Sequence, residues 1–141
     1  MKYSLGPKSL AKLDGVHPDL VRVVKRAIAI TRQDFMVREG IRTPARQAEL
    51  YAQGRTKPGP KVTWTMTSNH FRKADGYGHA VDICPFPVDW DTPSKFDAIA
   101  DAMETAADEL GVAIRWGANW DGDGKRREAK ETDSPHFELA R

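Results

Sequence analysis

The chain has 141 residues, of which 40% are hydrophobic and 30% charged, and its formal net charge at pH 7 is +2. These values predict one soluble globular domain over residues 1–141, with a core of its own. No stretch approaches the roughly 18 apolar residues that cross a bilayer, so membrane insertion is not expected, and so small a charge does not indicate nucleic acid as a partner.

The N-terminus and the cysteine content bear on where the protein is made. The first residues lack the apolar segment of a secretory signal, so we expect synthesis in the cytoplasm without a signal peptide. Cys84 is the only cysteine, which excludes an intramolecular disulfide. It follows an apolar run and precedes Pro85, and we expect a small buried hydrophobic residue rather than a nucleophile or a metal ligand.

The first half of the chain favours two helices and one strand. His17 and Pro18 begin a helix, because proline is tolerated at the first helical position, and apolar residues then recur at helical spacing. Residues 35–42 are predicted to form a short strand and a turn. Residues 43–54 open with Thr-Pro and close with glycine, a pattern typical of a helix.

The second half alternates strands with the longest predicted helix. A β-prone segment, an alternating strand, a helix that begins after Thr92, and two further short strands follow one another; they are residues 62–67, 78–85, 93–110, 112–116 and 136–139. This order predicts a compact α+β domain in which helices flank a small, mostly antiparallel sheet.

Two predicted loops are long for so small a domain. They cover residues 68–78 and 117–135, and each adjoins a histidine in a chain that has four. Structureless segments of this length in a compact domain are usually functional or disordered. We therefore expect functional residues in or beside these two loops.

The strand after Gly78 separates two polar side chains. Neighbouring residues of a strand point to opposite faces, so His79 and Asp82 do not easily bind the same ion. Asp82 can approach His70 if residues 71–77 turn back, which the two glycines near the end of that loop favour. In the last strand, the side chains of residues 136 and 138 share a face.

Two imidazoles and one carboxylate, from His70, His136 and Asp82, would leave a fourth metal position open for water. That pattern is typical of catalytic zinc rather than structural zinc. Zinc lowers the pKa of bound water toward roughly 7, and a nearby carboxylate must take the proton. Asp133, in an expected Ser-Pro turn, is one candidate, whereas Glu138 is better placed to orient a ligand. The residues alone leave open that each histidine is simply a hydrogen-bonded polar residue.

The assembled segments resemble the D-alanyl-D-alanine carboxypeptidase-like zinc metallopeptidases, whose superfamily also holds lysostaphin and hedgehog domains. The family pattern of Ser-x-His, Gly-x-Ala-x-Asp and Asp/Glu-x-x-His is found, in this order, at residues 68–70, 78–82 and 133–136. Residues 40–54 resemble the family's arginine segment before a helix. Residues 110–124 resemble the stretch before the last motif in small phage endolysins of the L-alanyl-D-glutamate peptidase type.

The resemblance implies the residues of the active site. It implies that His70, Asp82 and His136 bind one zinc ion. It implies that Asp133 is the general base and that Arg42 stabilises the oxyanion or holds a substrate carboxylate, tasks that suit a planar two-pronged cation.

The resemblance also implies that Ser68 tethers the loop or contacts substrate. From the residues themselves, Glu138 is expected to orient a metal ligand. Trp116 is expected to pack in the core or at its rim, and the alternative is that it helps to wall a peptide cleft. The interval between His70 and Gly78 is several residues longer than in the commonest form of the motif. The loop is therefore expected to follow a different path, whereas the expected zinc ligands stay the same.

A partial calcium motif lies in the second loop. Asn119, Asp121, Asp123 and Gly124 match positions 1, 3, 5 and 6 of a calcium-binding loop. The twelfth position holds Lys130 instead of the expected glutamate. A calcium site and an ordinary Asp/Gly-rich turn are therefore both open.

The resemblance implies an endolysin that hydrolyses peptidoglycan stem peptides, at the L-alanyl-D-glutamate bond, by attack of zinc-bound water. It implies synthesis in a host cytoplasm and release to the periplasmic wall by a holin-type pore. From the chain length we expect no separate cell-wall-binding module, and we expect a monomer. One alternative is a D,D-carboxypeptidase that trims terminal D-alanine. Another is a non-catalytic zinc- or calcium-binding domain associated with the wall.

Overall fold

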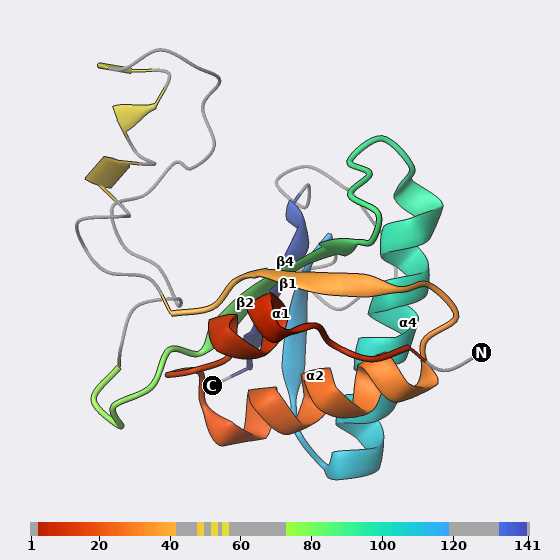
Figure 1. Ribbon diagram of the computed structural model, residues 1–141. Coiled ribbons are helices and arrows are strands. Elements are labelled where there is room, and N and C mark those ends of the chain that lie inside the picture. Colours follow the sequence, from red (N-terminus) through yellow and green to blue (C-terminus); the bar gives the residue numbers. More distant parts are fainter. Residues whose placement is uncertain are drawn as a thin grey trace.

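The computed structural model describes residues 3–41, 48–49, 52–53, 55–56, 73–118 and 134–140, together with the backbone alone of residue 133 (Figure 1). Seven elements follow in chain order: α1 (Pro7–Lys12), α2 (Pro18–Ile30), β1 (Phe35–Glu39), β2 (Ala80–Pro85), α4 (Pro93–Leu110), β3 (Ile114–Gly117) and β4 (Asp133–Leu139). The α+β class predicted from the sequence is confirmed.

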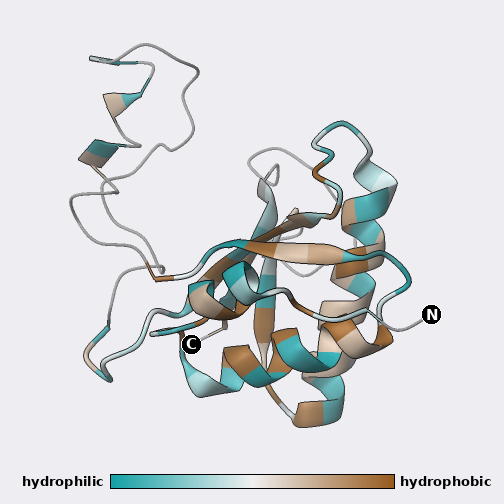
Figure 2. Ribbon diagram, in the orientation of Figure 1, coloured by the Kyte–Doolittle hydropathy of each residue, from teal (hydrophilic) through white to brown (hydrophobic). Residues whose placement is uncertain are grey.

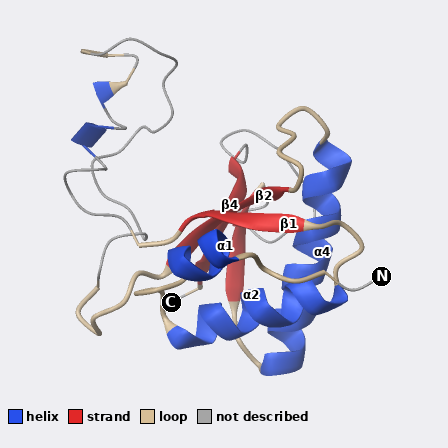
Figure 3. Cartoon of the chain, in the orientation of Figure 1, coloured by secondary structure: helices blue, strands red, loops and turns tan. Residues whose placement is uncertain are grey.

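The four strands form one antiparallel sheet in the order β1-β2-β4-β3, so β2 and β4 are its two central strands. Helix α2 packs against α4, and α4 contacts β2, β3 and β4. Figure 3 shows α2 and α4 together on one side of the sheet. Helices α2 and α4 therefore cover one face of the sheet, and the opposite face is called the open face below.

The hydrophobic core lies between this sheet face and the helices. Val81 is opposite Phe137, and Val37 is opposite Ile83, and all four side chains are buried. Burying one such side chain stabilises the fold by roughly 1.5–3 kcal/mol relative to leaving it exposed. Brown, hydrophobic stretches occur along β1 and β2, and α2 alternates between brown and teal (Figure 2).

Helices α2 and α4 begin and end as their sequences predict. The Nδ1 atom of His17 accepts a hydrogen bond from the backbone of Asp19 at 3.0 Å and so caps the start of α2. Helix α4 ends at Gly111, which has a φ of 68°. Glycine adopts this left-handed conformation at little cost. No described helix is both long and apolar enough to cross a membrane.

Strand β4 differs from its prediction because it begins at Asp133, three residues earlier than expected. Ser134 and Pro135 therefore belong to a strand and not to a tight turn at the end of a loop. The pairing with β3 shifts register between Trp116 and Gly117. A proline, which lacks an amide hydrogen, is tolerated at such an irregular position.

Two other differences concern helices. Helix α1, which the sequence analysis did not predict, has only six residues and starts with a proline. Of the predicted helix at residues 43–54, residues 48, 49 and 52 are helical. Its remaining residues, except for residue 53, and the β-prone segment 62–67 lie outside the described residues.

The turn that leads into β2 is fastened to the start of α2 through the backbone. The amide of Lys73 donates to the carbonyl of Tyr77 at 2.7 Å, and Gly76 has a φ of 89°, so the chain reverses here as expected. The amide of Gly78 then donates to Gly15, and the carbonyl of Gly78 accepts from His17, both at 2.9 Å. These bonds fix where β2 begins.

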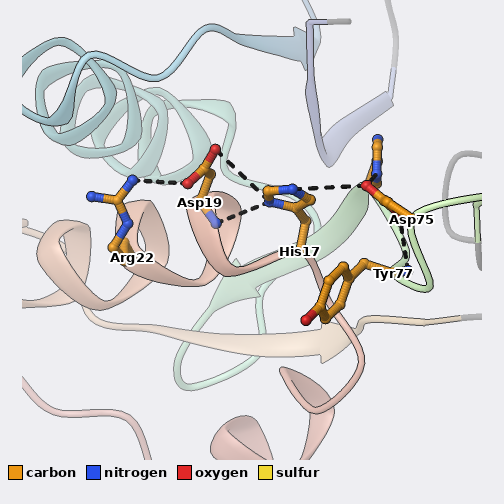
Figure 4. A network of polar contacts seen from close by, with 6 residues as sticks. His17, Asp19, Arg22, Asp75 and Tyr77 are labelled. Carbon is orange, nitrogen blue, oxygen red and sulfur yellow. Dashed lines mark hydrogen bonds and ion pairs between the residues drawn. The ribbon is translucent and has the colours of Figure 1, made fainter.

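A polar side-chain network reinforces this junction (Figure 4). The Nε2 atoms of His79 and His17 lie 2.7 Å and 3.7 Å from the same oxygen of Asp75. Because Nδ1 of His17 accepts a backbone hydrogen bond, the neutral ring carries its hydrogen on Nε2, toward Asp75. His79 is thus engaged away from Asp82, in agreement with the alternation of the strand.

Gly40 gives a first prediction about this fold. A side chain at this position would clash with the backbone carbonyl oxygen of Lys12, the last residue of α1. We expect Gly40→Ala to lower the free energy of unfolding by about 1–3 kcal/mol, the usual cost of overpacking, as measured by denaturant titration. Gly6→Ala is the control, because that position is open. Equal effects at both positions would contradict the packing described for Gly40.

The Asp75 network gives a second prediction, on pH. Burial raises the pKa of Asp75, but hydrogen bonds from His79 and from the Tyr77 amide, with the charges of both histidines, outweigh it and hold that pKa below its ordinary value. A lowered pKa means that the stabilisation is present above the pKa of the unfolded chain, about 3.9, and is lost as pH falls through the folded value.

We therefore expect Asp75→Asn to lower Tm at pH 7 and the difference from wild type to shrink below about pH 4. Thermal unfolding followed by circular dichroism over this range tests it. Asp108→Asn, an exposed acid on α4, is the matched control. A Tm difference for Asp75→Asn that is constant with pH, or grows toward acid, would show that the carboxylate charge does not hold this junction.

Candidate metal centre

The sheet face away from the helices carries the polar side chains of the two central strands. In β2, Asp82 points opposite to the buried core residues on either side of it, Val81 and Ile83. The sheet register places Asp82 directly across from His136 and Ala80 across from Glu138. Directly opposed residues of antiparallel strands share a face and are close neighbours. The fold therefore brings together two residues that are far apart in the sequence.

The Asp82–His136 pair is in close contact. Nδ1 of His136 lies 3.3 Å from Oδ1 of Asp82, and the side chains are 10% and 20% exposed. Partial burial strengthens the electrostatic interaction between such groups relative to bulk water.

Glu138 holds the other end of the His136 ring. Its Oε1 atom lies 2.8 Å from Nε2 of His136, and its Oε2 atom accepts a hydrogen bond of 3.1 Å from Arg115. An ionised carboxylate has no hydrogen to donate, so Nε2 carries the ring hydrogen. Arg115 could not be predicted as part of the site, because strand alternation indicates the face on which a residue lies but not its partner on the neighbouring strand.

The protonation pattern tests whether these residues fit a metal ion. With the hydrogen on Nε2, the lone pair of Nδ1 faces the carboxylate of Asp82, and two electron-rich atoms at 3.3 Å repel unless a proton or a cation lies between them. An imidazole nitrogen and a carboxylate oxygen are ligands that zinc prefers. A ligating histidine also commonly donates its other N–H to a carboxylate. The pair fits zinc.

The third predicted ligand, His70, lies outside the described residues. Among the residues that the structure does describe, no group of three histidine, cysteine or acidic side chains is placed to hold a metal ion. The two predicted ligands that can be located lie side by side, and the described chain by itself does not complete a site.

The remaining predicted residues divide into two groups. Ser68, Arg42 and the calcium-loop residues Asn119, Asp121 and Asp123 lie outside the described residues. For Asp133 the backbone alone is described, paired with Gly117 near the start of β4. Their roles stay predictions.

Trp116 packs in the core, which is the first of the two positions expected for it. Its side chain is 2% exposed, stacks on Phe137 with ring centroids 6.1 Å apart, and donates from Nε1 to the carbonyl of Ser134 at 2.6 Å. A ring buried in the core does not wall a peptide cleft. Trp116 instead supports the β4 backbone just before His136.

Cys84 lies two residues beyond Asp82 on the same strand and is fully buried, as predicted. Burial raises the pKa of its thiol; Arg38 nearby opposes this rise and Asp82 adds to it. A thiol with a raised pKa is a poor metal ligand and a poor nucleophile. Cys84 is therefore a packing residue beside the site.

Comparison with known proteins gives a consistent result. The family model described as phage L-alanyl-D-glutamate peptidase matches residues 1–140. The L-alanyl-D-glutamate peptidase of Escherichia phage T5 is 32% identical over 145 aligned positions, which cover 99% of each chain. The peptidoglycan L-alanyl-D-glutamate endopeptidase CwlK of Bacillus subtilis (strain 168) is 32% identical over 82% of this chain and 66% of its own.

A solved structure supports the same assignment. The crystal structure of the Serratia marcescens L-Ala D-Glu endopeptidase ChiX superposes with a TM-score of 0.73 and 34% identity, over 99% of this chain and 90% of that one. The likeness thus extends across the whole fold that carries the Asp82–His136 pair. This chain belongs to the phage L-alanyl-D-glutamate peptidase family.

Proposed function

We propose that this protein is a zinc-dependent peptidoglycan peptidase that hydrolyses the L-alanyl-D-glutamate bond of stem peptides. The observation that carries the proposal is the arrangement of Asp82, His136 and Glu138 on the open sheet face, in a chain that matches the peptidase family over residues 1–140. The imidazole nitrogen and the carboxylate oxygen are suitable zinc ligands, and the family indicates which peptide bond is cut.

The chemistry divides between the metal and the chain. Bound zinc would lower the pKa of a water molecule and polarise the scissile carbonyl. His136, through Nδ1, and Asp82 would hold the ion, with His70 as the further ligand that the motif implies. Glu138 keeps the His136 ring in the tautomer and orientation that ligation needs.

Hydrolysis then requires a proton carrier and a group that stabilises charge. As water adds to the carbonyl carbon of L-alanine, Asp133 would accept its proton. As the C–N bond breaks, Asp133 would return that proton to the leaving amine of D-glutamate. Arg42 would stabilise the negative charge on the carbonyl oxygen. Both roles follow from the motif positions.

The biological setting follows from the same family. We infer an endolysin that reaches the cell wall of the host after release from the cytoplasm through a separate holin-type pore, and that acts as a monomer. The partial calcium motif at residues 119–124 remains a prediction, and its effect would be to order the segment before β4.

The ligand and base assignments give a third prediction. We expect purified wild type to contain about one zinc ion per chain, because one catalytic site is proposed. We also expect it to lyse outer-membrane-permeabilised cells. Asp133→Ala should keep its zinc and lose activity, whereas His136→Ala should lose both. Elemental analysis and a turbidity assay measure the two properties on the same samples.

Product analysis on purified muropeptides decides among the alternatives. A new N-terminal D-glutamate supports the proposed bond, and free D-alanine would identify a D,D-carboxypeptidase instead. Zinc binding and wall binding without cleavage would identify a non-catalytic domain. Wild type that cannot be loaded with zinc and leaves the wall intact would end the hydrolase proposal.

Glu138 gives a fourth prediction. Removing the carboxylate that orients His136 should weaken zinc binding about 10- to 100-fold, the usual effect of losing such a partner. A chelator competition titration measures this for Glu138→Ala. The control is Glu109→Ala, which removes a carboxylate that also forms an ion pair, with Arg26 on the helical side. Unchanged zinc affinity in a folded Glu138→Ala protein would refute the orienting role.

A further inference from the structure

The edge strand β1 carries an irregularity directly beside the candidate metal centre. Val37 pairs with Ile83 and Glu39 pairs with Asp82, so Arg38 is an extra residue opposite the strand that holds the aspartate. Such β-bulges are common next to active sites, where they redirect side chains. Met36 is opposite Cys84 on the open face, and Arg38, two residues later, follows it on that side.

The guanidinium of Arg38 is held by an aromatic ring and not by an acid. Its Cζ atom lies 5.8 Å from the centre of the Trp90 ring, a cation–π arrangement. Arg38 is exposed, and within the described part of the chain no carboxylate forms an ion pair with it. Its positive charge is positioned without being neutralised there.

Trp90 is itself fixed in place. It is half-exposed, and its ring stacks on the buried Phe96 of α4 with centroids 6.0 Å apart. The residue before it, Asp89, accepts hydrogen bonds of 2.8 Å from both Thr92 and Lys95. Because these contacts pin the connection between β2 and α4, Trp90 offers a steady surface for the guanidinium.

Arg38 on β1 and Asp82 on β2 lie at the same level of the two paired strands. In the bulge, Arg38 directly precedes Glu39, the residue paired with Asp82. Cys84 lies beside Asp82 on β2 and opposite Met36 on β1. Arg38 therefore stands within electrostatic range of the face where Asp82 and His136 meet, on the β1 side.

The substrate of the proposed function carries a matching group. Glutamate has two carboxyl groups, and only one enters a peptide chain, so the residue that follows the scissile bond keeps one free carboxylate. A guanidinium binds a carboxylate through two parallel hydrogen bonds. Lysine or a neutral donor would not provide this two-pronged match.

We propose that Arg38, held on Trp90, binds the free carboxylate of the D-glutamate residue and so distinguishes glutamate from its neutral amide at that position. The inference rests on the proposed function, because it assigns a specificity residue to that same site. Arg38 acts here in substrate binding, separately from the role expected of Arg42 at the carbonyl oxygen.

The test compares two stem peptides that differ only in this group, one with the free glutamate carboxylate and one with the carboxamide. For zinc-loaded wild type we expect kcat/KM to favour the carboxylate about 10- to 100-fold, the range for a hydrogen bond to a charged group. In Arg38→Gln this ratio should fall to near 1. Arg38→Lys should give an intermediate ratio, because it keeps the charge and loses the fork.

Arg26→Gln is the matched control, because it removes an exposed arginine that pairs with Glu109 on the helical side. Its ratio should equal that of wild type. A ratio that stays high in Arg38→Gln, or that is near 1 already in wild type, overturns the inference while cleavage itself upholds the proposed function. Wild type that cleaves neither peptide would end both.

A third peptide separates the glutamate carboxylate from acids later in the stem. It keeps the glutamate carboxylate and has every later carboxyl group amidated. If Arg38 binds the glutamate carboxylate, wild type should cleave this third peptide with the same kcat/KM as the first. Arg38→Gln should then no longer prefer the third peptide over the peptide with the glutamate carboxamide. If wild type loses its preference once the later carboxyl groups are amidated, Arg38 binds a carboxylate later in the stem peptide, and the proposal is overturned.

Discussion

The cross-strand pairing of Asp82 with His136 is the contact on which the candidate site depends. The two residues come from the central strands β2 and β4, which are distant in sequence and adjacent in the sheet. Central strands are paired on both sides, so a side chain on them is held more firmly than one on a loop. A shift of one residue in this register would turn one member of the pair toward the core.

Two separate anchors keep that register. On the core side, Val81 and Phe137 are fully packed beneath the helices, so slippage would expose apolar surface. At the start of β2, the backbone bonds of Gly78 and the contacts of Asp75 with two histidines tie the strand to the beginning of α2. The chemistry of one face thus depends on packing and polar contacts elsewhere.

The open face combines groups with different tasks within a short distance. The exposed Arg115 and the buried Glu138 form a chain of charge-assisted hydrogen bonds that ends on the His136 ring. Across the sheet, the bulge in β1 turns Arg38 toward Trp90, on a connection that α4 holds. Metal ligation would then use the edge of β2 that pairs with β4, and substrate recognition the edge that pairs with β1. The side chains of β2 itself alternate between the core and the site.

The sequence by itself determined what repeats locally or forms a motif. Strand alternation placed Asp82 on the face away from His79, Pro18 and Thr92 marked where two helices begin, and three short motifs indicated the family. Only the tertiary structure decided which strands are neighbours, because pairing depends on contacts between distant segments. It therefore showed that β4 extends back to Asp133, that Trp116 is buried, and that Arg115 and Arg38 accompany the site.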